Sequence, residues 1–501
     1  MAIAAWLGTL LLAAAQPPAG EAGAAAPAVN HVPAVAGLEG VDADLQAGRF
    51  AAARQRIERV LRGRLPGPVV RDLQKLRGEI LLSEDQRDQA MAAFAAAEAV
   101  APRDPAVALY ELDLAYGRGD PLLAVAAVDH LIERFPEAAR MAEPTRIVPL
   151  ITWLRQNQRA RDADTLLIRL AGIGFGGDNL ATRDNFAIEA AAGAAAAGRL
   201  DEARALARRV HSRQELTMAL TERRFSALWP DIEAQVGPHM AAAEATAISE
   251  AEATAARHPD SVAARHGLMK AYYLAGRYAG ADRVGAAFAA TSAAMGAIDE
   301  AGGWLVNDHA LVLYAMGRGD AADARFAAMR VIDIAQHGWL ISMVINRLEL
   351  LVRDHRWDRA LPLLDDAAAL SEVYGSPYAR QLTRRLKLCT LHALGHDDEA
   401  EALLAVLRAH ETESPGSLID ALICLGRVDE AEPVLVRWLG RTGEAGAAID
   451  SLQPPGAGRS SDPSIWTQGW EQLRERPAVR QALAAVGRTL PEAYWPRPAA
   501  E

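Results

Sequence analysis

Cysteine, lysine and aromatic residues are scarce in this chain of 501 residues, and each scarcity excludes a class of protein. Two cysteines cannot form the framework of a disulfide-rich domain. Aromatic residues make up 5% of the chain, which argues against a large β-sandwich or barrel, because strands favour aromatic and β-branched residues. The net charge of −11 at pH 7 makes the chain a poor partner for nucleic acids, whose phosphates need a cationic surface.

Alanine and arginine are correspondingly abundant. Lys75, Lys270 and Lys387 are the only lysines among 53 basic residues, so the other 50 are arginines, a bias typical of a GC-rich bacterial genome. Hydrophobic residues make up 51% of the chain, and alanine supplies much of that fraction. Because alanine and arginine are both strong helix formers, the composition predicts an all-α protein.

Motifs that carry catalysis or bind a metal are also missing. The chain contains no HExxH, CxxC, Walker A or G-x-S-x-G motif. Residues 172–177 match the dinucleotide pattern G-x-G-x-x-G, but they follow the helical stretch 162–170, so we expect a helix end there. We therefore predict no catalytic residue, no metal site, no cofactor and no enzymatic activity.

The N-terminus carries an apolar run over residues 2–15, too short to span a bilayer. Ala13, Ala14 and Ala15 before Gln16 are typical of a signal-peptide cleavage site, although no basic residue precedes the run. We expect a signal peptide or the remnant of a membrane anchor over residues 1–15 and an Ala/Pro/Gly-rich linker over residues 16–40. The protein is then periplasmic or otherwise exported, with membrane-tethered and cytoplasmic forms as alternatives. Membrane contact is expected at most through this segment.

A short motif recurs along the rest of the chain: a glycine, then a charged residue, and an alanine five residues after the glycine. It predicts turns between paired helices at Gly48, Gly198, Gly276, Gly395 and Gly426. The alanines of the repeat recur at separations of 31 to 43 residues, except for one gap of 78, for which we expect a degenerate unit centred on Ala247. Such periods indicate tandem helix–turn–helix repeats. The alanines are Ala53, Ala90, Ala124, Ala163, Ala203, Ala281, Ala324, Ala360, Ala400 and Ala431.

The repeat resembles the tetratricopeptide repeat (TPR) family. The best unit has Gly78 and Leu81 on its first helix, Ala90 and Phe94 on its second and Pro102 at its end. The next unit repeats this register 34 residues later, with Ala124 and Pro136. The resemblance implies a right-handed α-solenoid of ten or eleven repeats over residues 41–440, in which alanine lets two helices cross closely.

Residues 441–501 lose the repeat and are expected to form a loop and a C-terminal helical cap, because a solenoid must cover its last apolar face. Trp438, Trp466, Trp470 and Trp495 cluster near this end and are expected to pack in the cap. Cys389 and Cys424 lie in apolar helical stretches, which favours buried thiols. A disulfide between neighbouring repeats remains possible if the protein is exported.

The resemblance also implies a concave groove, lined by the first helices of the repeats, that binds extended peptides or helices. We therefore expect a non-enzymatic scaffold for a protein or peptide partner, with no nucleic-acid partner. The alternatives are the sensor half of a larger membrane-bound signalling or transcriptional regulator and, third, an enzyme with an unrecognised site. Numbering each unit with its crossing alanine as position 20 projects these residues into the groove: Asp72, Lys75, Glu79, Tyr110, Asp113, Tyr116, His266, Lys270, Tyr273, Asn346, Glu349, Arg353, Arg385 and His392.

Overall fold

The computed structural model describes residues 35–100, 104–117, 119–289, 291–441, 443–454 and 464–495. In these ranges the backbone is helical almost throughout, and the one β-type pairing is an isolated antiparallel bridge between Glu222 and Gly487. This confirms the all-α prediction. The chain divides into two compact units on either side of Gly176 and Gly177, and each unit is described by itself. The predicted signal peptide and most of the linker lie outside the described residues.

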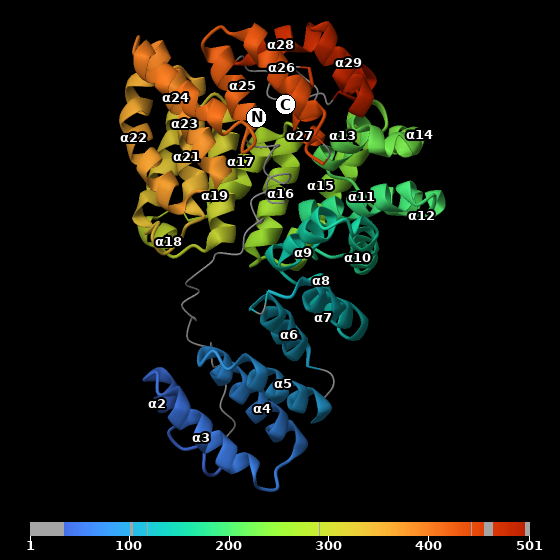
Figure 1. Ribbon diagram of the computed structural model, residues 1–501, viewed down its shortest axis with the longest axis vertical. Helices are drawn as coiled ribbons and strands as arrows, with labels where there is room; N and C mark the ends of the chain where they lie inside the picture. Colours follow the sequence, from blue (N-terminus) through green and yellow to red (C-terminus); the bar gives the residue numbers. More distant parts are fainter. Residues whose placement is uncertain are drawn as a thin grey trace. The chain divides into compact units, whose positions relative to one another are not determined.

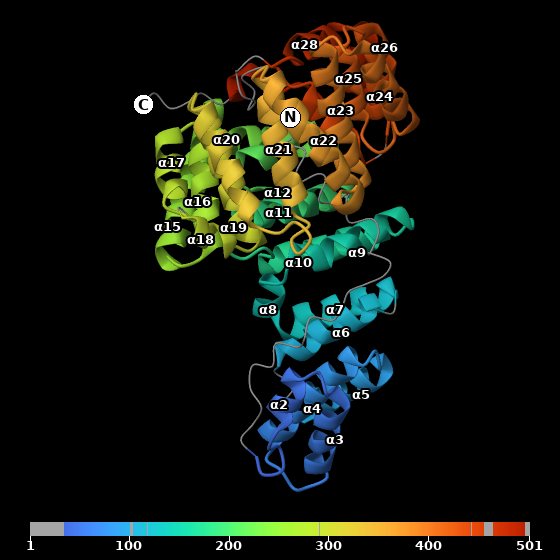
Figure 2. The same ribbon diagram turned by 90° about the vertical axis from the view of Figure 1, so that its left-hand side faces the viewer.

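The unit that ends at Gly176 contains four helix pairs, which are stacked in chain order in Figure 2. A short helix, α8, separates the third pair from the fourth, and Pro136 begins it after α7 has ended, as expected for a closing proline. The pairs are α2 (Val41–Gln46) with α3 (Phe50–Leu61), α4 (Gly67–Ser83) with α5 (Arg87–Val100), α6 (Pro105–Gly117) with α7 (Pro121–Arg134), and, after α8 (Pro136–Arg140), α9 (Pro144–Gln156) with α10 (Ala160–Ile173).

The unit that begins at Gly177 contains six further pairs, coloured green to orange in Figure 1. A short helix, α18 (Ser292–Gly296), and a 3-10 turn, η3 (Met329–Val331), lie between pairs. The pairs are α11 (Leu180–Ala196) with α12 (Leu200–Ala207), α16 (Val262–Leu274) with α17 (Tyr278–Ala286), α19 (Glu300–Ala315) with α20 (Gly319–Ala328), α21 (Leu340–Arg353) with α22 (Trp357–Tyr374), α23 (Pro377–Ala393) with α24 (Asp397–Ala409), and α25 (Pro415–Cys424) with α26 (Val428–Leu439).

All ten pairs turn in the same way. One residue after each first helix has a positive φ, between 56° and 82°. The N–H of the following residue bonds to the carbonyl five positions back, at 2.7 to 3.1 Å, which is the Schellman motif that ends a helix. The five predicted glycines are among these turn residues. The full set is Gly48, Asp85, Gly119, Gln158, Gly198, Gly276, Gly317, His355, Gly395 and Gly426.

The residue five positions after each of these turns is an alanine that is fully buried where the two helices cross. Nine of the ten predicted alanines occupy this position. The exception is Ala324, which is exposed; the buried alanine of that pair is Ala322. Ala324 lies five residues after Gly319, whereas the left-handed turn residue is Gly317, two positions earlier.

The crossing of α4 with α5 shows how close the helices come. A Cβ atom added to Gly78 would lie 2.4 Å from Cε1 of Phe94. Glycine on the first helix therefore makes room for the aromatic ring four residues after the crossing Ala90, as the resemblance implies.

The gap of 78 residues does not contain the expected helix pair centred on Ala247. Ala247 is buried, but its helix α15 (Ala241–Arg257) packs against α14 and α16. Before it come α13 (Arg213–Thr221), a 3-10 turn η1 (Arg223–Leu228), α14 (Trp229–Val236) and a second 3-10 turn η2 (Pro238–Met240). Pro230 and Pro238 lie in the first turns of α14 and η2, where proline is favoured, so the segment forms three separate helices instead of one pair.

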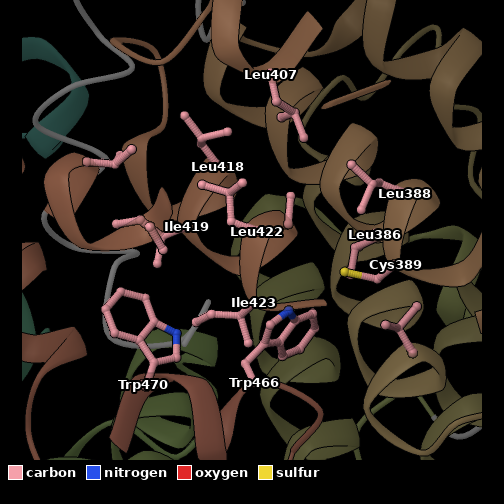
Figure 3. Packing of buried hydrophobic residues seen from close by; sticks show 14 of the residues in the cluster. Leu386, Leu388, Cys389, Leu407, Leu418, Ile419, Leu422, Ile423, Trp466 and Trp470 are labelled. Carbon is pink, nitrogen blue, oxygen red and sulfur yellow. The ribbon is translucent and has the colours of Figure 1, made fainter. Parts of the chain in front are cut away.

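The C-terminal residues pack as the predicted cap. They form α27 (Ala445–Ser451), α28 (Thr467–Glu475), α29 (Pro477–Val486) and a 3-10 turn η4 (Glu492–Tyr494). Figure 3 shows Trp466 and Trp470 beside Ile423, in a cluster that continues through α23 and α25. Trp438, Trp466 and Trp470 are all buried there.

The same segment also packs against residues 213–240, a contact that the repeat pattern did not predict. Arg488 donates to the carbonyl of Leu220 at 2.7 Å and pairs with Glu233 at 2.7 Å. His239 Nδ1 lies 3.0 Å from the carbonyl oxygen of Trp495. Helix α13 therefore packs against α27, and the turns η1 and η2 pack against α29 and η4, so the contacts of this unit form a closed circuit. Helices α13, α14 and α29 lie on the right of Figure 1.

Cys389 and Cys424 form a disulfide that joins α23 to α25, the first helices of successive pairs. The sequence had favoured buried thiols and left this pairing open. The glycines of residues 172–177 end α10, with Gly174 in the left-handed conformation, so the expected helix end is confirmed. None of the helices described is both long enough and apolar enough to cross a bilayer.

Candidate partner-binding face

The projected residues of the first unit meet one another across successive first helices. The Tyr110 hydroxyl on α6 donates to Glu79 on α4 at 2.5 Å, and the Tyr110 ring stacks on Phe94 with centroids 4.5 Å apart. Lys75 on α4 pairs with Asp104 at 2.9 Å. Burial raises the pKa of the Glu79 carboxyl, although the Tyr110 hydroxyl opposes this shift.

The contacts continue from α6 to α9. Asp113 pairs with Arg146 at 2.7 Å, and the Tyr116 hydroxyl donates to the Arg146 carbonyl. Burial raises the pKa of Asp113, and Arg146 acts against that rise. Asp72 instead pairs with its neighbour Arg71. The projection therefore places these residues together, but most of their polar atoms are already engaged within the chain.

In the second unit a polar row crosses α16, α19 and α21. His266 Nε2 on α16 lies 2.7 Å from Asp308 on α19. Asn307, beside Asp308, accepts a hydrogen bond at 2.8 Å from Asn346 on α21. Burial alone would raise the pKa of Asp308, but the His266 hydrogen bond and the charge of Lys270 hold it below its usual value.

The row continues through α23 and α25 as a buried ion-pair network. Arg385 on α23 contacts Glu349 on α21 and Asp420 on α25, the latter at 2.5 Å. Its guanidinium lies 4.8 Å from the centre of the Trp466 ring, and Trp470 donates to Asp420 at 2.8 Å. Burial acts to lower the pKa of Arg385, but the two carboxylates raise it above its usual value. Such a network holds successive helices in register, so Glu349 and Arg385 are not free to bind a partner as projected.

Other projected residues remain accessible. Lys270 is half-buried and has no ion-pair partner among the described residues. Tyr273 is also half-buried, with its ring 5.8 Å from that of Tyr278. Arg353 lies over the Tyr314 ring at 5.6 Å, and His392 Nδ1 lies 2.7 Å from Asp397. Lys270 and Tyr273 occupy one face of α16, so a ligand that reaches Lys270 also reaches Tyr273.

One carboxylate on this face was missed by the sequence analysis. Glu215 on α13 is 2% exposed; one of its oxygens accepts from Asn185 at 3.3 Å, and the other has no partner in the described structure. Burial raises the pKa of Glu215 to about 7, although Asn185 and the charge of Lys270 oppose the rise. Glu215 lies in the degenerate region, where no repeat register existed to project it.

The other missed residues follow from the repeat register. With Ala322 in place of Ala324 as position 20, the same numbering projects Asn307, Asp308 and Tyr314 into the groove. Applied to the pair that crosses at Ala431, it projects Asp420. The sequence analysis missed these residues because it placed the crossing alanine of α20 two residues too late and projected no groove residues for the last pair.

No protein-family model matches the chain, and no curated protein matches it. Among solved structures it is similar to yeast Tom70 (10% identity, 89% of this chain and 98% of that chain, TM-score 0.33). It is also similar to the TPR domain of P58(IPK) (14%, 89% and 98%, TM-score 0.19) and to the Cut9–Hcn1 hetero-tetramer of the APC/C (12%, 87% and 95%, TM-score 0.22).

The fold assignment depends on the chain's own backbone. Ten helix pairs share one Schellman turn and one buried crossing alanine. By that geometry the chain is an α-solenoid of TPR-like repeats.

Proposed function

We propose that the protein is a non-enzymatic scaffold that binds an extended segment of a protein partner on the first-helix face of residues 177–495. The observation that carries the proposal is the patch of Lys270 and Tyr273 on α16. Lys270 has no ion-pair partner among the described residues, while the polar groups on either side of it are largely paired within the chain. A cation and an aromatic hydroxyl on one helix face can hold a peptide's carbonyls or acidic side chains.

The test compares two double variants in the full-length chain. A photo-crosslinking residue at Tyr273 first identifies the partner in the native host, and the purified partner is then titrated by calorimetry. Lys270→Ala with Tyr273→Ala is expected to weaken binding by about 2 kcal/mol if the pair is a hot spot, with the melting temperature unchanged. The control, Lys387→Ala with Tyr374→Ala, removes a lysine from α23 and a tyrosine from α22, both outside the patch. It is expected to leave the affinity for the partner unchanged. If both double variants bind the partner as tightly as the wild type does, the partner binds outside the Lys270–Tyr273 patch.

We further propose that the protein is exported. The disulfide between Cys389 and Cys424 supports this, because disulfides persist in oxidising compartments and are rare in the cytoplasm. Mass spectrometry of protein recovered from the host is expected to find an N-terminus near Gln16 and an oxidised cysteine pair. Recovery of intact Met1 with two free thiols from the cytoplasmic fraction would contradict export.

A further inference from the structure

A histidine in the first unit lies between two glutamates that come from separate helices. His130 on α7 has Nε2 3.2 Å from Glu98 on α5 and Nδ1 3.1 Å from Glu111 on α6. One ring nitrogen and one oxygen from each glutamate lie within 4.8 Å of one another. The side chains are only 28%, 19% and 25% exposed, in the order His130, Glu98 and Glu111.

Within the part of the chain that the structure describes, no basic side chain compensates the charge of this cluster. Among the described residues neither Glu98 nor Glu111 pairs with a lysine or arginine, and each pairs with His130 alone. The preceding residue on α7 shows the usual solution, because Asp129 pairs with Arg169. Two half-buried carboxylates on either side of one imidazole therefore favour the binding of a cation between them.

We propose that Glu98, Glu111 and His130 bind a divalent transition-metal ion, with zinc the class that this donor set favours. Imidazole nitrogen and carboxylate oxygen are both good zinc ligands, and three protein ligands leave a fourth position for water. Ligand atoms around tetrahedral zinc lie about 3.4 Å apart. Because the two glutamates contact different ring nitrogens, one of them must rotate toward the nitrogen that binds the metal, and the three groups start within 4.8 Å of one another. The imidazole presents one nitrogen to the metal.

The position of the cluster implies that a bound metal stabilises the contact between two successive repeats. Its ligands join α5 of one helix pair to α6 and α7 of the next, so the ion ties two successive repeats together. Because the unfolded chain lacks a preformed site, the free energy of binding adds to the stability of the folded unit. No sequence motif reveals this site, since the ligands are separated by 13 and 19 residues on three helices.

The experiment uses the tag-free full-length chain, treated with a chelator and then titrated with Co²⁺ while the visible absorption of bound cobalt is followed. We expect stoichiometric binding that Zn²⁺ displaces, and a melting temperature that rises with Zn²⁺. His130→Ala and Glu111→Gln should each weaken Co²⁺ binding by about tenfold or more. The second variant is isosteric, so a folding defect in the first does not end the test.

The matched control is His258→Ala, which removes the histidine of another ion pair, with Asp178 at 3.3 Å. It should bind Co²⁺ as the wild type does. Identical cobalt spectra and affinities for the wild type, His130→Ala and Glu111→Gln would overturn the proposal. So would a lack of stoichiometric binding, and the cluster would then be an imidazole in contact with two carboxylates and no metal.

Discussion

At the scale of single residues, the left-handed turn position is the most informative feature of this chain. Seven of the ten turns use glycine, which has no Cβ and adopts a positive φ without strain. Asp85, Gln158 and His355 adopt the same conformation at a cost of about 1 kcal/mol or more each. A search for glycine alone misses these three turns, although the alanines that follow them were predicted from the repeat. Glycine at any of the three is expected to be a stabilising substitution.

Gln158→Gly should raise the free energy of unfolding by about 0.5–1 kcal/mol, because it removes left-handed strain and the exposed side chain makes no hydrogen bond in the described structure. Gln156→Gly, two residues earlier at the exposed end of α9, is the control. It should lower the free energy of unfolding by about 1 kcal/mol. Denaturant titration of both variants measures the effects. A loss of stability in Gln158→Gly would contradict the strain argument.

A second residue-scale prediction concerns Glu215, whose pKa burial raises from 4.5 to about 7 in the folded chain. The folded state holds this proton more tightly than the unfolded state does. The resulting stability is present at low pH and is lost as the pH rises through about 7. Glu215→Gln cannot titrate, so it should gain stability relative to the wild type as the pH rises.

Melting temperatures of the wild type and Glu215→Gln at several pH values, on both sides of the folded pKa, test this. The difference between the two proteins should grow toward alkaline pH. Glu399→Gln makes the same chemical change at an exposed glutamate in the first turn of α24 and is the control for the substitution itself. Parallel curves for the wild type and Glu215→Gln would mean that Glu215 titrates alike in both states.

At the scale of the element, the crossing alanine decides how closely two helices of a pair approach. Ala400 is fully buried on α24, five residues after the turn at Gly395. The side of a helix that carries this alanine is fixed by the turn, which is why an error of two residues moved the prediction from buried Ala322 to exposed Ala324.

Ala400→Leu should therefore overpack its crossing and lower the free energy of unfolding by about 1–3 kcal/mol. Ala324→Leu makes the same chemical change on an exposed helix surface and should stay within about 0.5 kcal/mol of the wild type. Thermal unfolding of the two variants distinguishes the positions. Equal destabilisation would mean that the register assigned to α20 is wrong.

At the scale of the second unit, the C-terminal segment both covers the last helix pair and returns to α13 and α14. Arg488 is the centre of that contact, since its guanidinium lies 3.7 Å from the centre of the Trp229 ring while it also bonds to Leu220 and Glu233. These contacts hold the C-terminal segment against residues 255 and 268 positions earlier in the sequence.

Arg488→Ala should lower the free energy of unfolding by about 2–3 kcal/mol, because it leaves a carbonyl and a carboxylate without their charged partner. It should also make the segment after residue 464 cleavable by limited proteolysis. Arg480→Ala, which removes a 62% exposed arginine from α29, should change neither. Unchanged proteolysis of Arg488→Ala would show that the apolar contacts alone hold the segment.

The sequence by itself determined the helical class, the helix pairs, nine of ten crossing alanines and the tryptophan-lined cap. These depend on local rules: glycine allows the left-handed turn, and alanine five residues later faces the partner helix. The sequence also projected Glu79, Tyr110, Glu349 and Arg385 to first-helix positions of successive repeats, and the contacts between them come from the structure.

Only the tertiary structure decided what those side chains do. Burial turns Glu349, Arg385 and Asp420 into an internal network, and only the distance between α23 and α25 pairs the two cysteines. The return of Arg488 to α13 and the meeting of Glu98, Glu111 and His130 join residues that no common periodicity relates. Their positions depend on how successive helix pairs rotate against each other, which is set by packing along the whole unit and has no local signal in the chain.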